Sequence, residues 1–158
     1  MKSGLPMAFN VRTIFAFAMA ALMGGVLTSI LSTQIILRYL ETAGAIFPLA
    51  TRAQAIWLDL NGFAPTLIAL SAIGYAIAFP VARLISRRIG ALRTTGYMLS
   101  GYVMIIVMIF AIELFYQTVL GSTITPIAAG RDVWGLAVIG LGGAAGGWVF
   151  AVLSPRKP

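Results

Sequence analysis

The chain alternates long apolar stretches with short polar connections. A helix needs about 20 apolar residues to cross a hydrocarbon core about 30 Å thick, and four stretches reach that length. They lie at about residues 13–33, 65–85, 95–116 and 133–153. We therefore predict an all-α integral membrane protein, a four-transmembrane-helix bundle that occupies residues 1–158 as a single membrane domain.

The connection at residues 34–64 has a helical pattern of its own. In its second half, apolar residues recur at helical spacing as far as Gly62, a residue type that often ends helices. Arg52 and Asp59 share the opposite face, and Trp57 is of a type enriched at the level of the lipid headgroups. We predict a short interfacial helix here, lying on the membrane surface; an irregular loop is the alternative.

The distribution of basic residues predicts an orientation. Both termini and the connection at residues 86–94 would share one side, with eight of the 11 basic residues and no acidic residue: Lys2, Arg12, Arg83, Arg87, Arg88, Arg93, Arg156 and Lys157. The other side would hold the connections at residues 34–64 and 117–132, with Arg38, Arg52, Arg131 and all four acidic residues, Glu41, Asp59, Glu113 and Asp132. Because Lys and Arg accumulate in cytoplasmic segments, this distribution predicts that the N- and C-termini are cytoplasmic.

The composition supports a membrane class. Hydrophobic residues make up 60% of the chain and charged residues 9%, whereas soluble domains carry about 25% charged residues. The net charge of +7 is spread over the ends of the apolar stretches, so we expect membrane lipids as partners and no nucleic acid. The organisation resembles the broad class of small four-span proteins of bacterial cytoplasmic membranes. It predicts a location in the cytoplasmic (inner) membrane.

Several kinds of chemistry are excluded by residues that the sequence lacks. It has no cysteine and no histidine, so it has no disulfide, thiolate zinc site, His-ligated haem or metal, or Ser-His pair. The glycine-rich segment "LGGAAGG" lacks the Lys-Ser/Thr pair of a phosphate-binding loop. We predict no metal site, no cofactor and no enzymatic activity.

Small residues recur every four positions in the first and fourth spans. These rows include Gly24, Gly25 and Ser29 in the first span and Gly143 and Gly147 in the fourth. Helices in lipid associate through close backbone approach, which small residues permit. Either the rows pack the bundle internally, or one of them faces outward and docks a partner or a second copy.

One carboxylate lies inside the third apolar stretch. Glu113 falls roughly 5 Å before the outer end of the predicted helix, at 1.5 Å per residue, and Tyr116 and Gln117 flank it. An acid this close to the surface can reach a partner or water at modest cost. We predict a pair with Arg131 that ties the two outer helix ends together, with Asp132 capping the fourth helix. The alternative is a proton- or cation-binding carboxylate.

Four arginines lie near the connection between the second and third spans: Arg83, Arg87, Arg88 and Arg93. Arginines at the cytoplasmic ends of spans fix topology and contact anionic headgroups, and we predict that role here. A specific anionic ligand or a cytoplasmic partner is the alternative.

These features predict a non-enzymatic membrane protein that acts through helix–helix association. It would be an accessory or assembly subunit of a membrane complex, or a homo-oligomer, so its partner would be itself or another membrane protein. The alternative is a small transporter or channel component that uses the carboxylate near the outer membrane face.

Overall fold

The computed structural model describes residues 11–86, 93–119, 121, 128–130 and 132–155. Within them lie α1 (Val11–Thr42), α2 (Leu49–Gly62), α3 (Ala64–Ser86), α4 (Arg93–Val119), the short 3-10 helix η2 (Ala128–Gly130) and α5 (Val133–Leu153). The described residues contain no strand. Four of the helices, α1, α3, α4 and α5, are long and apolar enough to cross a membrane. The prediction of an all-α fold with four such helices is confirmed.

The first helix is longer than a membrane crossing requires. Its 32 residues measure about 48 Å at 1.5 Å per residue, against a hydrocarbon core of about 30 Å. The extra length carries the polar residues Gln34, Arg38 and Glu41. After α1 the chain turns at Gly44, whose φ of 96° lies in the left-handed region that favours glycine.

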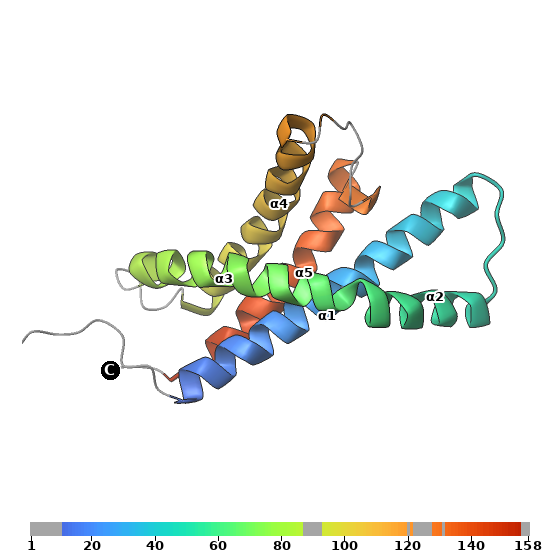
Figure 1. Ribbon diagram of the computed structural model, residues 1–158. Helices are drawn as coiled ribbons and strands as arrows, with labels where there is room; N and C mark the ends of the chain where they lie inside the picture. The colour runs from blue at the N-terminus through green and yellow to red at the C-terminus, as the bar shows by residue number, and fades with distance from the viewer. Residues whose placement is uncertain (1–10, 87–92, 120, 122–127, 131, 156–158) are drawn as a thin grey trace, which may run out of the picture.

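The helix predicted in the first long connection is present as α2. It ends at Gly62, and a single residue, Phe63, separates it from α3. Helical hydrogen bonding nevertheless crosses the junction, because the Phe63 amide donates to the Asp59 carbonyl at 2.8 Å and the Leu67 amide donates to the Phe63 carbonyl at 3.1 Å. Residues 49–86 therefore form two helices in immediate succession, with no separate loop between them (Figure 1).

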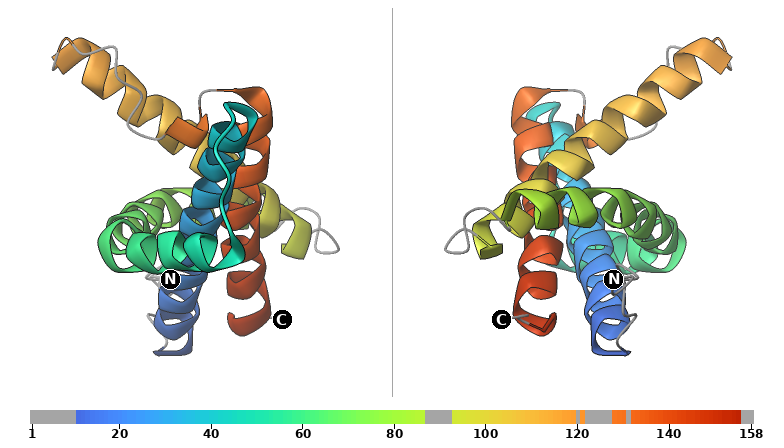
Figure 2. Two further views of the ribbon diagram at one scale, coloured as in Figure 1. Left: turned by 90° about the vertical axis from the view of Figure 1, so that its right-hand side faces the viewer. Right: turned by 90° about the vertical axis from the view of Figure 1, so that its left-hand side faces the viewer.

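The four long helices do not run parallel to one another. Figure 2 shows α1 and α5 side by side, with α3 crossing them at a steep angle and the second half of α4 pointing away from the other helices. In the packing, α5 contacts both α1 and α4, and α3 contacts the same two helices. The beginning of α1, the end of α3, the beginning of α4 and the end of α5 thus lie toward one end of the bundle (Figure 1).

The centre of the bundle is an aromatic cluster. The Phe79 ring stacks on Tyr75 at a centroid separation of 4.5 Å and on Phe150 at 4.3 Å, and Tyr97 meets it edge-on at 5.5 Å. All four residues are buried, and they come from α3, α4 and α5. Large apolar side chains elsewhere on the long helices are exposed, including Leu22, Ile77, Val107 and Leu141. Such an outer surface is suited to lipid rather than water.

Candidate functional site

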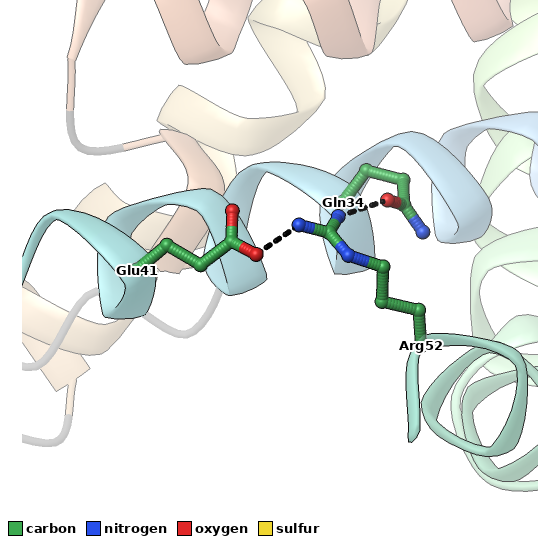
Figure 3. A network of polar contacts seen from close by, with 3 residues as sticks. All are labelled: Gln34, Glu41 and Arg52. Carbon is green, nitrogen blue, oxygen red and sulfur yellow. Dashed lines mark hydrogen bonds and ion pairs between the residues drawn. The ribbon is translucent and has the colours of Figure 1, made fainter. Parts of the chain in front are cut away.

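Polar side chains on the extended part of α1 form a network with α2 (Figure 3). Arg52 of α2 donates from Nη1 to the Gln34 side-chain oxygen at 3.1 Å, and its Nη2 pairs with Glu41. Gln34 and Glu41 are seven positions apart, so they lie on one face of α1 and a single guanidinium spans them. The Arg52 and Glu41 side chains are 27% and 33% exposed, so this pair stabilises the α1–α2 contact by on the order of 1 kcal/mol or less.

The second charged residue of α2 also faces α1. Asp59 accepts a hydrogen bond from the Thr33 hydroxyl, and the backbone carbonyl of Ser29 lies 3.0 Å from the same hydroxyl. The polar face of α2 is therefore turned toward the bundle. On the other side of α2, Trp57 and Leu58 are exposed.

Asp132 lies at the N-cap of α5, the position that the sequence predicts for it. Its Oδ1 accepts a hydrogen bond from the Gly135 amide at 2.6 Å, as expected of an Asp that satisfies an unpaired donor of the first helical turn. A side-chain hydrogen bond with Tyr39 of α1, and then the bond from the Gly135 amide, lower the pKa of the Asp132 carboxyl.

Glu113 lies deeper along its helix than the sequence suggests. Because α4 continues to Val119, six residues or roughly 9 Å separate Glu113 from the helix end. Its side chain is half-buried, and Gln117 Nε2 lies 3.5 Å from its Oε1, at the limit of a hydrogen bond. Arg131 lies outside the described residues, so the predicted Glu113–Arg131 pair stays a prediction.

An apolar groove opens between the start of α3 and the second half of α4. It has a volume of about 480 Å³ and is lined by Phe63, Thr66, Leu67, Leu70, Met108, Ala111, Ile112, Phe115 and Tyr116. Tyr116, which the sequence places beside Glu113, thus also forms part of the wall of this groove. The groove exists because the second half of α4 diverges from the bundle (Figure 2).

The small residues of α1 face the interior. A methyl group added to Gly25 would lie 2.6 Å from the Ile68 Cα of α3, and one added to Gly24 would lie 3.0 Å from the Tyr75 ring. Ser29 is fully buried. The glycines thus let α3 approach the α1 backbone closely, as small residues do between membrane helices.

The small residues of α5 face α4 and α1. A methyl group on Gly147 would lie 2.7 Å from the Tyr97 carbonyl carbon, and one on Gly143 would lie 2.9 Å from the Gly101 carbonyl carbon. Gly142 and Gly146 approach α1 in the same way, against Thr28 and Ala20. These rows are consequently inside the bundle, and none of these glycines is available as an outer docking face.

Several hydroxyl groups are buried between the helices. The Tyr75 hydroxyl donates to the Gly143 carbonyl at 2.8 Å. In the part of the chain that the structure describes, the hydroxyl oxygens of Thr28, Ser29 and Ser71 are buried and have no hydrogen-bond partner. Polar groups of this kind are normally paired, so these three are exceptions within the closely packed interior.

The arginines near the opposite end of the bundle contact the last residues of α5. Arg93 Nη2 donates to the Ser154 carbonyl at 3.1 Å and to its hydroxyl at 2.5 Å, and its guanidinium lies 5.8 Å from the centroid of the Tyr97 ring. Arg12 Nε donates to the Leu153 carbonyl at 3.1 Å. Arg93, predicted only as a headgroup and topology residue, thus also ties α4 to α5. Arg83 lies in the last turn of α3; Arg87 and Arg88 lie outside the described residues.

The α1–α2 network is the arrangement that sequence reasoning missed. The sequence predicts a Glu113–Arg131 pair, which stays a prediction, and gives no direct indication that Arg52 meets Glu41 and Asp59 meets Thr33. A signal was present as similar spacings on the two segments: Thr33 and Glu41 are eight apart, and Arg52 and Asp59 are seven apart. Two facing helices with polar residues at similar spacing are able to pair at both positions.

The described side chains offer no metal site, since no three His, Cys, Asp or Glu residues among them come close enough to hold an ion. No protein-family model, curated protein or solved structure matches this chain.

Proposed function

We propose that this protein is a non-enzymatic integral membrane protein that acts through helix–helix association, as a homo-oligomer or as an accessory subunit of a membrane complex. The observation that carries the proposal is the second half of α4. It leaves the bundle, borders the apolar groove, and exposes Phe110, Leu114 and Phe115 by 54–61%. Two of its polar residues, Glu113 and Gln117, have side chains 3.5 Å apart.

A helix of a second polypeptide suits this surface for two reasons. It would bury both the groove and the exposed face of α4 by van der Waals packing, which drives association in lipid. It would also supply hydrogen-bond partners to Glu113 and Gln117, because a polar group at this depth is costly without one. The small-residue rows cannot serve instead, since they are occupied inside the bundle.

The occupant that we propose is α4 of a second copy. Two-fold dimers are the commonest oligomers, and in such a dimer the same patch pairs with itself. The Gln117 amide of one copy could then donate to the Glu113 carboxylate of the other. A separate membrane polypeptide in the same groove would make the protein an accessory subunit, and the same experiment distinguishes the two.

The test is the molar mass of the purified protein in a mild detergent, measured by light scattering. We expect a mass above the 16.7 kDa of one chain, and we expect Phe115→Ala to lower it. Phe15→Ala is the matched control, because Phe15 on α1 is 57% exposed and Phe115 is 54% exposed. A wild-type monomer that brings no second polypeptide through purification would contradict the proposal, whereas a co-purifying polypeptide would assign the accessory role.

We further propose that the protein resides in the cytoplasmic membrane of a bacterium with both termini in the cytoplasm, and that α2 lies at the outer interface. The eight basic residues on the terminal side, against three on the other, support this orientation. The exposed Trp57 supports the place of α2. A cytoplasm-dependent reporter should be active after Pro158 and inactive at Gln54. Activity at Gln54 would reverse the orientation.

A transport role is the second candidate, and the unpartnered hydroxyls of Thr28, Ser29 and Ser71 favour it. Buried hydroxyls between membrane helices can line a path for water or ions. The test is cation or proton flux in liposomes, with Glu113→Gln compared with Glu41→Gln as the control. Flux that only Glu113→Gln abolishes would support transport; absence of wild-type flux would reject it.

A further inference from the structure

We propose that the end of the bundle formed by the start of α1, the start of α4 and the end of α5 binds an anionic phosphate group, carried by a membrane phospholipid or by a small soluble phosphate. The site is independent of the α4 groove, from which it is separated along the length of α4. It rests on three observations: a hollow, two arginines beside it, and the absence of acidic side chains from this end among the described residues.

The hollow lies where three helices meet. It has a volume of about 410 Å³ and is lined by Arg12, Thr94, Ala151, Val152, Ser154 and Pro155. This size falls within the range of about 300–1,000 Å³ that is usual for small-ligand sites. Arg93 lies beside it, since its guanidinium is bonded to the Ser154 residue that forms part of the wall. Each of these residues belongs to the described part of the chain.

The two arginines bring charge that the protein does not neutralise locally. Arg12 and Arg93 bond to backbone carbonyls and to one hydroxyl, all of them neutral acceptors. Within the described residues the single ion pair is Arg52–Glu41, which lies on the extended part of α1 and on α2. The acidic residues all lie away from this end: Glu41, Asp59, Glu113 and Asp132. Among the side chains that the structure describes, an anion in the hollow would therefore meet two guanidinium groups and no carboxylate.

The unused donors suit a phosphate. A guanidinium has five N–H donors in a planar fork that matches phosphate oxygens, and the bonds described occupy only Nε of Arg12 and Nη2 of Arg93. Thr94, a residue with a hydroxyl group, also forms part of the wall. The N-terminal ends of α1 and α4 add positive partial charge. The C-terminal end of α5 carries negative partial charge, which opposes anion binding. The arginines, however, already occupy the carbonyls of Leu153 and Ser154 at this end.

The experiment measures binding of short-chain phosphatidylglycerol to the full chain in a neutral detergent, with short-chain phosphatidylcholine as the uncharged comparison. We expect phosphatidylglycerol to bind more tightly, and Arg12→Gln to weaken it about fivefold, the usual worth of one arginine near a membrane surface. Arg38→Gln is the matched control, because Arg38 is an exposed arginine on the same helix but toward its other end.

A second pair of variants keeps the test independent of folding. Thr94→Val removes the hydroxyl in the wall and leaves both arginines, and Thr95→Val changes its exposed neighbour. We expect Thr94→Val to weaken phosphatidylglycerol binding and Thr95→Val to leave it unchanged. Equal wild-type binding of the two lipids, or equal losses in Arg12→Gln and Arg38→Gln, would overturn the proposal.

Competition with inorganic phosphate distinguishes the two sources of the group. Displacement of phosphatidylglycerol by millimolar phosphate would assign the site to the phosphate itself, and so to a soluble ligand as well. Retention of the lipid under the same conditions would assign the site to a phospholipid headgroup, because the acyl chains would then contribute to the affinity. Both results support an anionic phosphate site, whereas failure of the lipid comparison rejects it.

Discussion

The two halves of α4 belong to one continuous helix but have different surroundings. In the first half, Tyr97, Gly101 and Ile105 are buried against the glycines of α5. Of the five buried residues of α4, only Ile109 lies in the second half. Phe110 and Leu114 are more than half exposed there, as Leu99 and Val103 are on the outward side of the first half. Apolar side chains alone therefore do not bring helices together in lipid. Facing glycines do, because they allow backbones to approach and gain contact that lipid cannot supply.

The strongest way to break this contrast is to fill the glycine contact. In Gly147→Leu the new side chain would collide with the Tyr97 backbone, which cannot move aside without displacing α4. We expect the free energy of unfolding to fall by about 1–3 kcal/mol, the usual cost of overpacking a packed interior. Thermal unfolding in detergent, followed by tryptophan fluorescence, measures it. Val152→Leu is the control on the same helix, since Val152 is 56% exposed, and equal stability of the two variants would refute the packing role of Gly147.

A smaller effect is expected from the hydrogen bond within the same core. Tyr75→Phe removes the hydroxyl that donates to the Gly143 carbonyl and keeps the stacked ring. Hydrogen bonds between membrane helices contribute about 0.6 kcal/mol on average and up to about 1.7. We expect a loss in that range in the same unfolding assay. A stability equal to that of the wild type would mean that the carbonyl finds another donor, such as water.

Outside the core, the α1–α2 network should contribute less. Arg52→Ala removes the bridge to Gln34 and Glu41, and we expect a loss of about 0.5–1 kcal/mol because the pair is partly exposed to solvent. The coupling is best measured with a double-mutant cycle that adds Glu41→Ala. Gln54→Ala on the exposed side of α2 should have no effect. Additive losses for Arg52 and Glu41 would show that the pair does not stabilise the protein.

The smallest effect concerns the Asp132 cap and depends on pH. The folded state lowers the pKa of Asp132. The stabilisation that the ionised cap gives to the folded protein is therefore fully present above the ordinary Asp pKa of about 3.9, and it is lost as the pH falls through the lower pKa of the folded state. We expect wild type and Asp132→Asn to have parallel unfolding temperatures from pH 8 to pH 5. Below about pH 4 the unfolding temperature of the wild type should fall further than that of Asp132→Asn, since the asparagine can cap α5 without titrating. Unfolding temperatures of the two proteins that stay parallel at every pH would contradict the role of Asp132 as an ionised cap.

Much of the architecture could be predicted from the sequence because lipid imposes a simple rule. Each backbone polar group must be paired within its own segment, so an apolar stretch of about 20 residues becomes a helix whatever surrounds it. The Asp132 cap could be predicted for a similar reason, as a short polar residue directly before such a stretch. The full length of α1 could not be predicted in this way, because the apolar stretch ends at about residue 33 and the helix continues to Thr42. Its last turns are polar and are held by contacts with α2, which lies later in the chain.

The partners of individual side chains could not be predicted in the same way. The sequence predicts that Glu113 pairs with Arg131, and this stays a prediction because Arg131 lies outside the described residues. Arg93 looked like a lipid-facing residue, but it contacts Ser154, 61 positions away. Spacing along a helix identifies the residues that share a face. It does not say which other helix that face meets.

The sequence by itself determined that this is a membrane protein with four long apolar helices, which residues lie at their ends, and which rows of small residues permit close approach. Those properties follow from local composition, since hydrophobic length and helical periodicity act within one segment. Only the tertiary structure decided that the glycine rows face inward, that the polar side of α2 packs on α1, that the second half of α4 stands apart, and that Arg12 and Arg93 meet at the end of α5. Each depends on how helices cross, and crossing is set by side-chain and backbone contacts between segments far apart in the chain.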